Sequence, residues 1–252
     1  MSDIFATVLY EPLYNLLVAL YNLLPWGGLG LAIILVTVIV KGLLFPLTFK
    51  TMKAQKQLQE VQPKIEAIKK QYKDDKETMA KELMAVYKSN NVNPFASCLP
   101  TILQLVIFLT LFRVLRAGIA TINADLLYSF VHNPGTMNHL FLGMNLAEVS
   151  IPFAILAAVT QYFQARQMVS RRPPKVVQGS SGALDEDIAA NMNRSMMYAL
   201  PLIMLVAGVT TLPGGVTLYI FISTLLTWVL TAYFLKPKAE SKVEVIAPAK
   251  NN

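Results

Sequence analysis

Residues 28–49, GLGLAIILVTVIVKGLLFPLTF, set the class of this protein. The stretch holds 22 residues, of which 14 are Leu, Ile, Val or Phe, and its one charge is Lys41. A helix needs about 20 mostly apolar residues to cross the apolar core of a bilayer. The apolar side chains favour insertion by roughly 4–8 kcal/mol in sum, whereas a lysine at the helix centre costs about 2.5–3.5 kcal/mol. The stretch therefore predicts a membrane-spanning helix that carries a buried cation.

The composition extends this prediction to the whole chain. Of the 252 residues, 54% are hydrophobic and only 15% are charged, whereas soluble domains carry about 25% charged residues. The longest polar stretch, residues 50–93, is too short to build a large core of its own. The sequence therefore predicts an all-α polytopic membrane protein.

Several classes of function lack their signature in this sequence. It contains no Walker loop, no GxSxG and no HExxH, so nothing indicates nucleotide hydrolysis or hydrolase chemistry. The single cysteine, Cys98, excludes an internal disulfide framework. His132 and His139 have no further ligand residues near them, and residues 1–27 lack the Lys or Arg of a signal peptide. We therefore expect a protein that is not an enzyme, with no cofactor, no metal site and no cleaved leader.

Residues 50–93 hold ten lysines and six acids and show the periodicity of two helices. The first apolar face consists of Leu58, Val61, Ile65, Ile68 and Tyr72, spaced three and four apart. The second apolar face consists of Met79, Leu83 and Val86. Asp74 and Glu77 resemble a capping box at the start of the second helix, and Pro63 is expected to kink or restart the first. The stretch predicts an antiparallel helical hairpin.

The N-terminal residues 3–24 are apolar but interrupted by Glu11, Pro12, Asn15 and Asn22. Three tyrosines in this stretch suit the headgroup boundary of a membrane: Tyr10, Tyr14 and Tyr21. We therefore predict an amphipathic helix that lies in the interface rather than a further span.

Apolar stretches and the polar segments between them predict five membrane-spanning helices. The spans are expected at 28–49, 94–116, 149–166, 195–212 and 216–235. The connecting segments are expected to be an interfacial helix and turn at 1–27, a lysine-rich hairpin at 50–93, a loop at 117–148, a flexible loop at 167–194, a turn at 213–215 and a basic tail at 236–252.

The positions of Lys and Arg predict the orientation of these spans, since cytoplasmic loops carry the excess of positive charge. Ten, five and four such residues fall in the segments 50–93, 166–194 and 236–252. None falls in the segments 1–27, 117–148 and 213–215. With five spans, the N-terminus is therefore expected outside and the C-terminus in the cytoplasm. Arg113 and Arg116, at the outer end of the second span, are expected to snorkel.

Lys41 is the residue most in need of a functional explanation. It precedes Lys50 by nine residues, about 13 Å along a helix, which is too far for easy snorkelling to the cytoplasmic headgroups. No acid lies within any predicted span, so we expect water or a transient partner around this cation. Thr37 lies one turn earlier on the same face. Other spans offer the polar residues Thr101, Gln104, Thr160, Gln161, Gln164, Thr217, Thr224, Thr227 and Thr231. Threonine stripes of this kind also occur as plain packing surfaces.

Several motifs together resemble the YidC/Oxa/Albino family of membrane protein insertases. They are VIVKGLLFPLT in the first span, the hairpin with the following NPFASCLPTILQLVIFLTLF, then FLGMNL, MNRSMMYALPLIM and LPGGVTLYIFIS. The resemblance covers residues 10–235 and points to the short forms without a large periplasmic domain. It implies five spans around a hydrophilic groove that is open to the cytoplasm and to lipid. A basic residue in the first span, usually Arg, would attract acidic or polar groups of a client.

The resemblance also assigns residues and partners. Lys41 stands where the family usually has Arg, and Thr37 and Gln104 match groove positions. Tyr219 matches the first of an aromatic pair, whose second position is Ile220 here. We thus expect a client-binding groove formed by Lys41, Thr37, Gln104, Thr101, Gln164, Tyr219 and Thr224. The implied partners are nascent membrane proteins, lipid, and a ribosome or targeting machinery at the cytoplasmic loops and tail. The resemblance leaves open whether a Sec translocon takes part. The implied location is the bacterial plasma membrane.

Two other functions compete with the insertase. The first is a small anion or solute transporter that uses Lys41 as its binding site, although the chain lacks the internal repeats common in transporters. The second is a structural assembly factor for membrane proteins, which would need similar client-binding surfaces.

Overall fold

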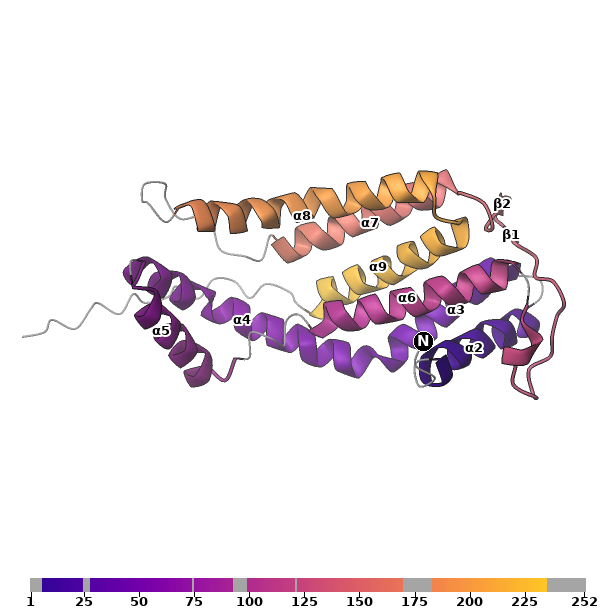
Figure 1. Ribbon diagram of the computed structural model, residues 1–252, viewed down its shortest axis with the longest axis horizontal. Helices are drawn as coiled ribbons and strands as arrows, with labels where there is room; N and C mark the ends of the chain where they lie inside the picture. The colour runs from indigo at the N-terminus through magenta and orange to yellow at the C-terminus, as the bar shows by residue number, and fades with distance from the viewer. Residues whose placement is uncertain are drawn as a thin grey trace, which may run out of the picture.

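The computed structural model describes residues 6–24, 28–73, 75–92, 99–120, 122–169 and 183–234. Helices make up most of this part, with one short β-hairpin (Figure 1). In chain order the elements are η1 (Ala6–Tyr10), α2 (Glu11–Leu23), α3 (Gly28–Leu43), α4 (Phe45–Gln71), α5 (Lys76–Ser89), α6 (Leu99–Ala120), η4 (Ala124–Leu126), β1 (Leu140–Phe141), β2 (Met144–Asn145), α7 (Ile151–Val169), α8 (Ala183–Thr210) and α9 (Gly214–Phe234). The described part is therefore all-α in class, as the composition predicted.

Within the described residues, α9 is the one helix that is by itself long and apolar enough to cross a membrane. The pair α3 and Phe45–Leu58 of α4 meets the same criterion when taken together, with a bend of 58°. Met197–Thr210 of α8 is a shorter apolar helix. The number of five spans remains a prediction.

The predicted first span is broken near its end. α3 ends at Leu43 and α4 begins at Phe45, so the predicted boundary at residue 50 lies inside α4. Pro46 in the first turn of α4 explains the break, because proline has no N–H to donate to the carbonyl of Gly42. Pro63 does not end α4, which continues to Gln71.

The lysine-rich segment forms the helical hairpin α4–α5. This hairpin and the strands β1 and β2 lie at opposite ends of the described structure (Figure 1). The apolar stripes meet as their spacing predicted: Val61 and Ile65 are buried and pack against Leu83 and Val86. Val92 completes this small core. The hairpin therefore has an apolar seam of its own.

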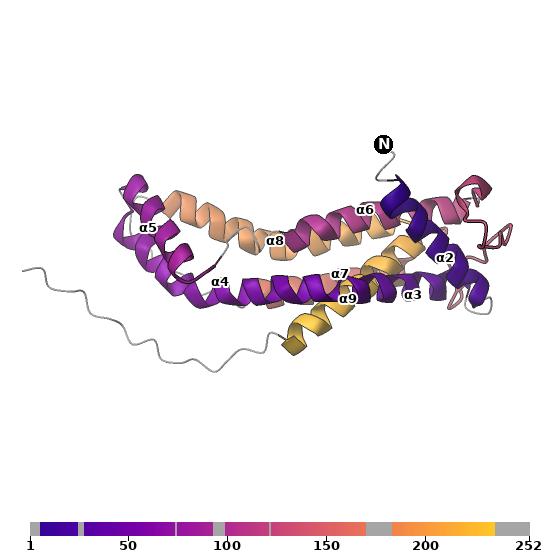
Figure 2. The same ribbon diagram turned by 90° about the horizontal axis from the view of Figure 1, so that it is seen from below.

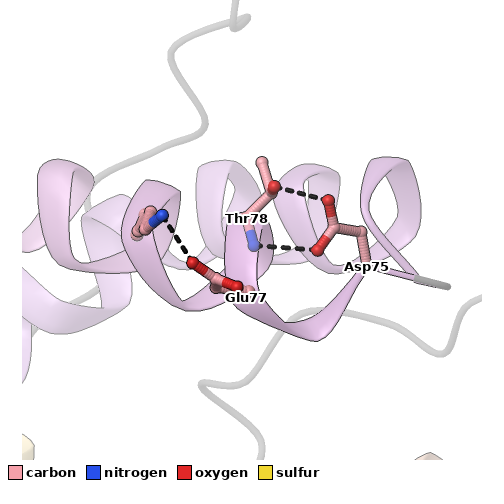
Figure 3. A network of polar contacts seen from close by, with 4 residues as sticks. Asp75, Glu77 and Thr78 are labelled. Atoms are coloured by element: carbon pink, nitrogen blue, oxygen red, sulfur yellow. Dashed lines mark hydrogen bonds and ion pairs between the residues drawn. The ribbon is translucent and has the colours of Figure 1, made fainter.

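Asp75 caps α5, whereas the sequence had suggested Asp74, which lies outside the described residues. The Asp75 carboxylate accepts a hydrogen bond from the backbone N–H of Thr78 at 3.0 Å and another from the Thr78 hydroxyl (Figure 3). Glu77 pairs with Lys81 one turn later at 2.7 Å. Both hydrogen bonds from Thr78 favour the ionised carboxylate, so they lower the pKa of Asp75 below its usual value.

We expect the cap to make the first turn of α5 sensitive to acid. Because the pKa of Asp75 is lower in the folded state than in the unfolded chain, its contribution is complete above the unfolded value and is lost as the pH falls through the folded value. Hydrogen-exchange protection of the Thr78 amide should fall over this range. Asp75→Asn keeps a capping oxygen and should remove the pH dependence, whereas Asp75→Ala should lower protection at every pH. An unchanged profile in Asp75→Asn would contradict this assignment.

Other helices also begin or end elsewhere than predicted. α8 begins at Ala183, whereas we expected a flexible loop over 167–194 and a span from 195. The sequence ALDEDIAA at 183–190 contains strong helix formers, but its polarity led to the prediction of a loop. α7 runs on to Val169 and α6 to Ala120, a few residues beyond their predicted ends. α7 packs against both α8 and α9, and α9 packs against α3 (Figures 1 and 2).

The N-terminal helix α2 packs against α3, α6 and η4. Tyr14 is fully buried, so its ring lies in the protein core and not at a headgroup boundary, in contrast to the prediction. The Tyr14 hydroxyl accepts a hydrogen bond from the backbone N–H of Asn123, and the Tyr21 hydroxyl accepts one from that of Asn138. The Asn22 amide donates to the carbonyl of His132. The polar residues of α2 therefore fasten the segment 122–138 to the helix.

Asn15 is the centre of this attachment, and its loss should destabilise the protein. It is buried, donates to the carbonyl of Leu126 at 2.8 Å and accepts from the N–H of Tyr128 at 2.7 Å. In Asn15→Leu both backbone groups lose their partner, at a cost of about 1–3 kcal/mol for each group that stays buried. A lower midpoint of thermal unfolding in detergent is expected. Asn22→Ala, which removes one exposed hydrogen bond, should shift the midpoint much less; equal shifts would contradict the role of Asn15.

Candidate functional site

Lys41 lies in the last turn of α3 and is partly buried. Its Nζ donates a hydrogen bond to Oγ1 of Thr227 on α9 at 3.0 Å. The Thr227 hydroxyl in turn donates to the carbonyl of Ser223 at 2.8 Å. The two helices that best fit a membrane span are therefore joined by a polar contact at Lys41, where α9 crosses α3 near its junction with α4 (Figure 2).

Thr227 is the partner that sequence reasoning did not select. It belongs to the threonine stripe of the last predicted span, but the stripe alone does not say which member lies opposite Lys41. The sequence predicted water or a transient partner around Lys41, and the structure adds a resident partner, because the Thr227 hydroxyl accepts a hydrogen bond from its ammonium group. A hydroxyl accepts a hydrogen bond from a cation without cancelling its charge.

Thr37 has a more local role than its position suggested. Its side chain is fully buried, and its hydroxyl donates to the carbonyl of Ile33 at 2.7 Å within the same helix. This is the usual way for a threonine to satisfy its hydroxyl inside a helix. Thr224 does the same toward Ile220 at 2.6 Å. Both hydroxyls are therefore satisfied within their own helices.

Tyr219 links two helices. It is buried, and its ring stacks on that of Phe108 in α6 with centroids 6.4 Å apart. Aromatic pairs at this separation are favourable contacts. Tyr219 therefore belongs to the core between α6 and α9 rather than to an exposed surface.

The remaining predicted site residues lie on α6 and α7. Thr101 and Gln104 fall within α6, and their side chains lie outside the described residues. Gln164 on α7 is partly buried. Gln161, one turn earlier on α7, buries its amide oxygen without a hydrogen-bond partner in the described structure. Such an acceptor is costly in a dry site and suits a position that a water or a polar ligand group can reach.

Metal binding finds no support among the described residues, where no three or more His, Cys, Asp or Glu residues stand close enough to hold an ion. A shallow pocket lies beside the β-hairpin, lined by residues 144, 145 and 148–152, at the other end of α3 from Lys41. The polar centre at Lys41 is thus built from helix-borne side chains and not from that pocket.

This arrangement defines a class of protein: an all-α protein with helices of membrane-spanning character, two of which are joined by a contact between a cation and a threonine. Residues 20–242 match the family described as 60Kd inner membrane protein. The chain belongs to this family, which confirms the resemblance found in the sequence.

Three relatives illustrate the match, and each bears the name membrane protein insertase YidC. The chain is 32% identical over 88% of its length to the protein of Pelobacter propionicus, of which it spans 37%. It is 32% identical to that of Fusobacterium nucleatum, over 84% of this chain and 88% of the relative. It is 36% identical to that of Clostridium tetani over 68% of both chains. The chain thus spans well under half of the Pelobacter relative but most of the Fusobacterium one.

Proposed function

We propose that this chain is a membrane protein insertase of the bacterial inner membrane, which moves client transmembrane segments and short polar tails from the cytoplasm into the bilayer. The observation that carries the proposal is the contact of Lys41 on α3 with Thr227 on α9, inside helices of membrane-spanning character. The family and the names of the relatives support the same activity. They do not favour the transporter alternative.

Lys41 would act as a temporary partner for acidic or polar groups of the client. The hydrogen bond from its ammonium group to the neutral hydroxyl of Thr227 keeps the cation in place. A carboxylate forms a charge-assisted hydrogen bond that is roughly twice as strong as a neutral one. A client carboxylate can therefore displace the hydroxyl, and the hydroxyl can take the ammonium group back when the client leaves. Exchange between the two partners avoids a bare cation in the membrane.

A polar groove around Lys41 would lower the barrier that a polar client segment has to cross. Each unsatisfied backbone group costs several kcal/mol in lipid, so a wetted path through part of the bilayer reduces the total. The apolar part of the client then moves sideways into lipid, which supplies the driving force without nucleotide hydrolysis. The membrane potential adds about 2.3 kcal/mol per charge per 100 mV for acidic segments.

The orientation of the chain completes the proposal. Five spans, with the N-terminus outside and the C-terminus in the cytoplasm, would place the α4–α5 hairpin where clients arrive. Its exposed lysines Lys53, Lys64, Lys69 and Lys76 suit an anionic surface such as lipid headgroups. The basic loop and tail would dock a ribosome or targeting machinery, with or without a Sec translocon.

Reconstitution tests this function. Vesicles that contain only the purified chain should protect the tail of a small single-span client from added protease, and empty vesicles should not. Equal protection in both would remove the insertase proposal. A client with a long, highly charged tail serves as the control for protection that does not come from insertion, since its tail should stay accessible.

A further inference from the structure

The hairpin of β1 and β2 has an unusual residue at its tip. Leu140 pairs with Asn145 and Phe141 with Met144, so Leu142 and Gly143 form the two-residue turn. Both turn residues have positive φ, 50° at Leu142 and 77° at Gly143. This type of turn favours Asn-Gly or Gly-Gly, because a leucine in the left-handed region is disfavoured by its Cβ. The conformation of the turn therefore does not explain why a leucine occupies this position.

The leucine gains no burial inside the described structure. Leu142 is 76% exposed, and Leu140 on the same hairpin is 61% exposed. Residues 126–147 contain no Asp, Glu, Lys or Arg, so no charge hinders entry of this tip into an apolar phase. A strained, exposed leucine at an uncharged tip indicates that its apolar contact lies outside this chain.

The hairpin is rigidly mounted on three helices. The ring of Phe141, on the opposite face from Leu140, fills the space left by Gly30 of α3 and contacts Phe153 of α7. The N–H of Leu29 at the start of α3 donates to the carbonyl of Asn138 at 3.0 Å. The N–H groups of Gly214 and Gly215 at the start of α9 donate to the carbonyls of Glu148 and Leu146. The tip is therefore fixed relative to the N-terminal ends of α3, α7 and α9 (Figure 1).

The position of the tip indicates what covers it. α7 starts just after the hairpin and exposes Ile151, Ile155, Val159 and Phe163, which are spaced four apart and share one face. In an inner membrane protein such an exposed apolar face meets lipid. Val149, which is also exposed, lies in the sequence between the hairpin and this face. The exposed leucines thus extend a lipid-facing surface past the end of the helix.

We infer that the tip of the β1–β2 hairpin, Leu140 and Leu142, is a lipid anchor that inserts into the bilayer at the boundary between acyl chains and headgroups. The anchor fixes the depth at which α3, α7 and α9 start. It does not depend on the insertase proposal, since it needs only a bilayer around the helices.

Site-directed spin labelling in pure phosphatidylcholine vesicles tests the anchor. Cys98→Ser removes the native cysteine, and a nitroxide is attached in turn to Leu142→Cys, to Ile155→Cys as the lipid-facing control and to Glu82→Cys on α5 as the aqueous control. The quantity measured is the ratio of nitroxide accessibility to oxygen and to a water-soluble nickel chelate. We expect the ratio at residue 142 to lie several-fold above that at residue 82 and near that at residue 155. A ratio equal to that at residue 82 would overturn the anchor.

Two further measurements separate lipid from other partners and from misfolding. The experiment is repeated with less protein per lipid. If the oxygen-to-nickel accessibility ratio at residue 142 falls on this dilution, the partner is a second copy of the chain and the anchor is overturned. Leu142→Asn suits the turn and should fold as well as the parent in detergent. In that background a label at Leu140→Cys should become at least severalfold more accessible to the nickel chelate, and an unchanged value would contradict the inference.

Discussion

Replacing Lys41 by alanine should reduce the insertion of a client with an acidic translocated tail by about tenfold or more. The estimate takes a hydrogen bond to a charged group as about 1.5–3 kcal/mol, with about 1.4 kcal/mol for each factor of ten. The loss should appear as a lower initial rate of protease protection in vesicles of the purified protein. A client whose tail is neutral should be affected much less, because it makes no charge-assisted contact with Lys41.

Two control variants separate the charge of Lys41 from its place in the fold. Lys41→Arg keeps the charge and adds a planar fork of donors, so it should retain most of the activity toward the acidic client. Lys50→Ala removes an exposed lysine from α4, nine residues further on, and should have little effect. Equal losses in Lys41→Ala and Lys50→Ala would show that the position of the charge does not matter.

We expect Gly30→Ala to lower the free energy of unfolding more than a methyl group added at any other position of α3. A Cβ at Gly30 would overlap the ring of Phe141, which packs directly on the helix backbone. Adding a methylene to a filled core costs about 1–3 kcal/mol, and here the obstacle is an aromatic ring held by its own hairpin. The thermal unfolding midpoint in detergent should fall clearly, and protease cleavage within residues 122–150 should become faster.

Gly42 on the same helix is the matched control for Gly30. A Cβ at Gly42 would meet no atom within 4 Å, so Gly42→Ala should be neutral or stabilising by up to about 1 kcal/mol through helix propensity. Phe141→Ala removes the ring and should reduce the additional cost of Gly30→Ala, as a double-mutant cycle would measure. Additive losses would mean that the ring is not the obstacle.

Some features of this structure follow directly from local sequence patterns. The apolar spacing in residues 58–65 and 83–86 predicted the seam of the α4–α5 hairpin, because a helix repeats its faces whatever surrounds it. The charge and hydropathy around Lys41 likewise identified the helix that carries the polar centre. Helical periodicity depends only on the residues of one segment, so it can be predicted from the sequence of that segment alone.

Other features depend on contacts between segments. Thr227 becomes the partner of Lys41 only through the way in which α9 crosses α3, and four threonines on one face are equivalent until that crossing is known. Tyr14 is buried because residues 122–128 fold back over α2. The apolar residues next to Tyr14 in the sequence do not predict this contact. The polar start of α8 was mistaken for a loop because its charges outweighed its helix-forming residues.

The central claim is that Lys41 receives the negative charge of a client inside the membrane. It is tested most directly by inserting two clients that differ only in their tails, one with two glutamates and one with two lysines, into vesicles of the parent protein or of Lys41→Glu. The parent should insert the acidic client faster, and Lys41→Glu should abolish or reverse that preference. An unchanged preference in Lys41→Glu, with insertion itself intact, would contradict the account.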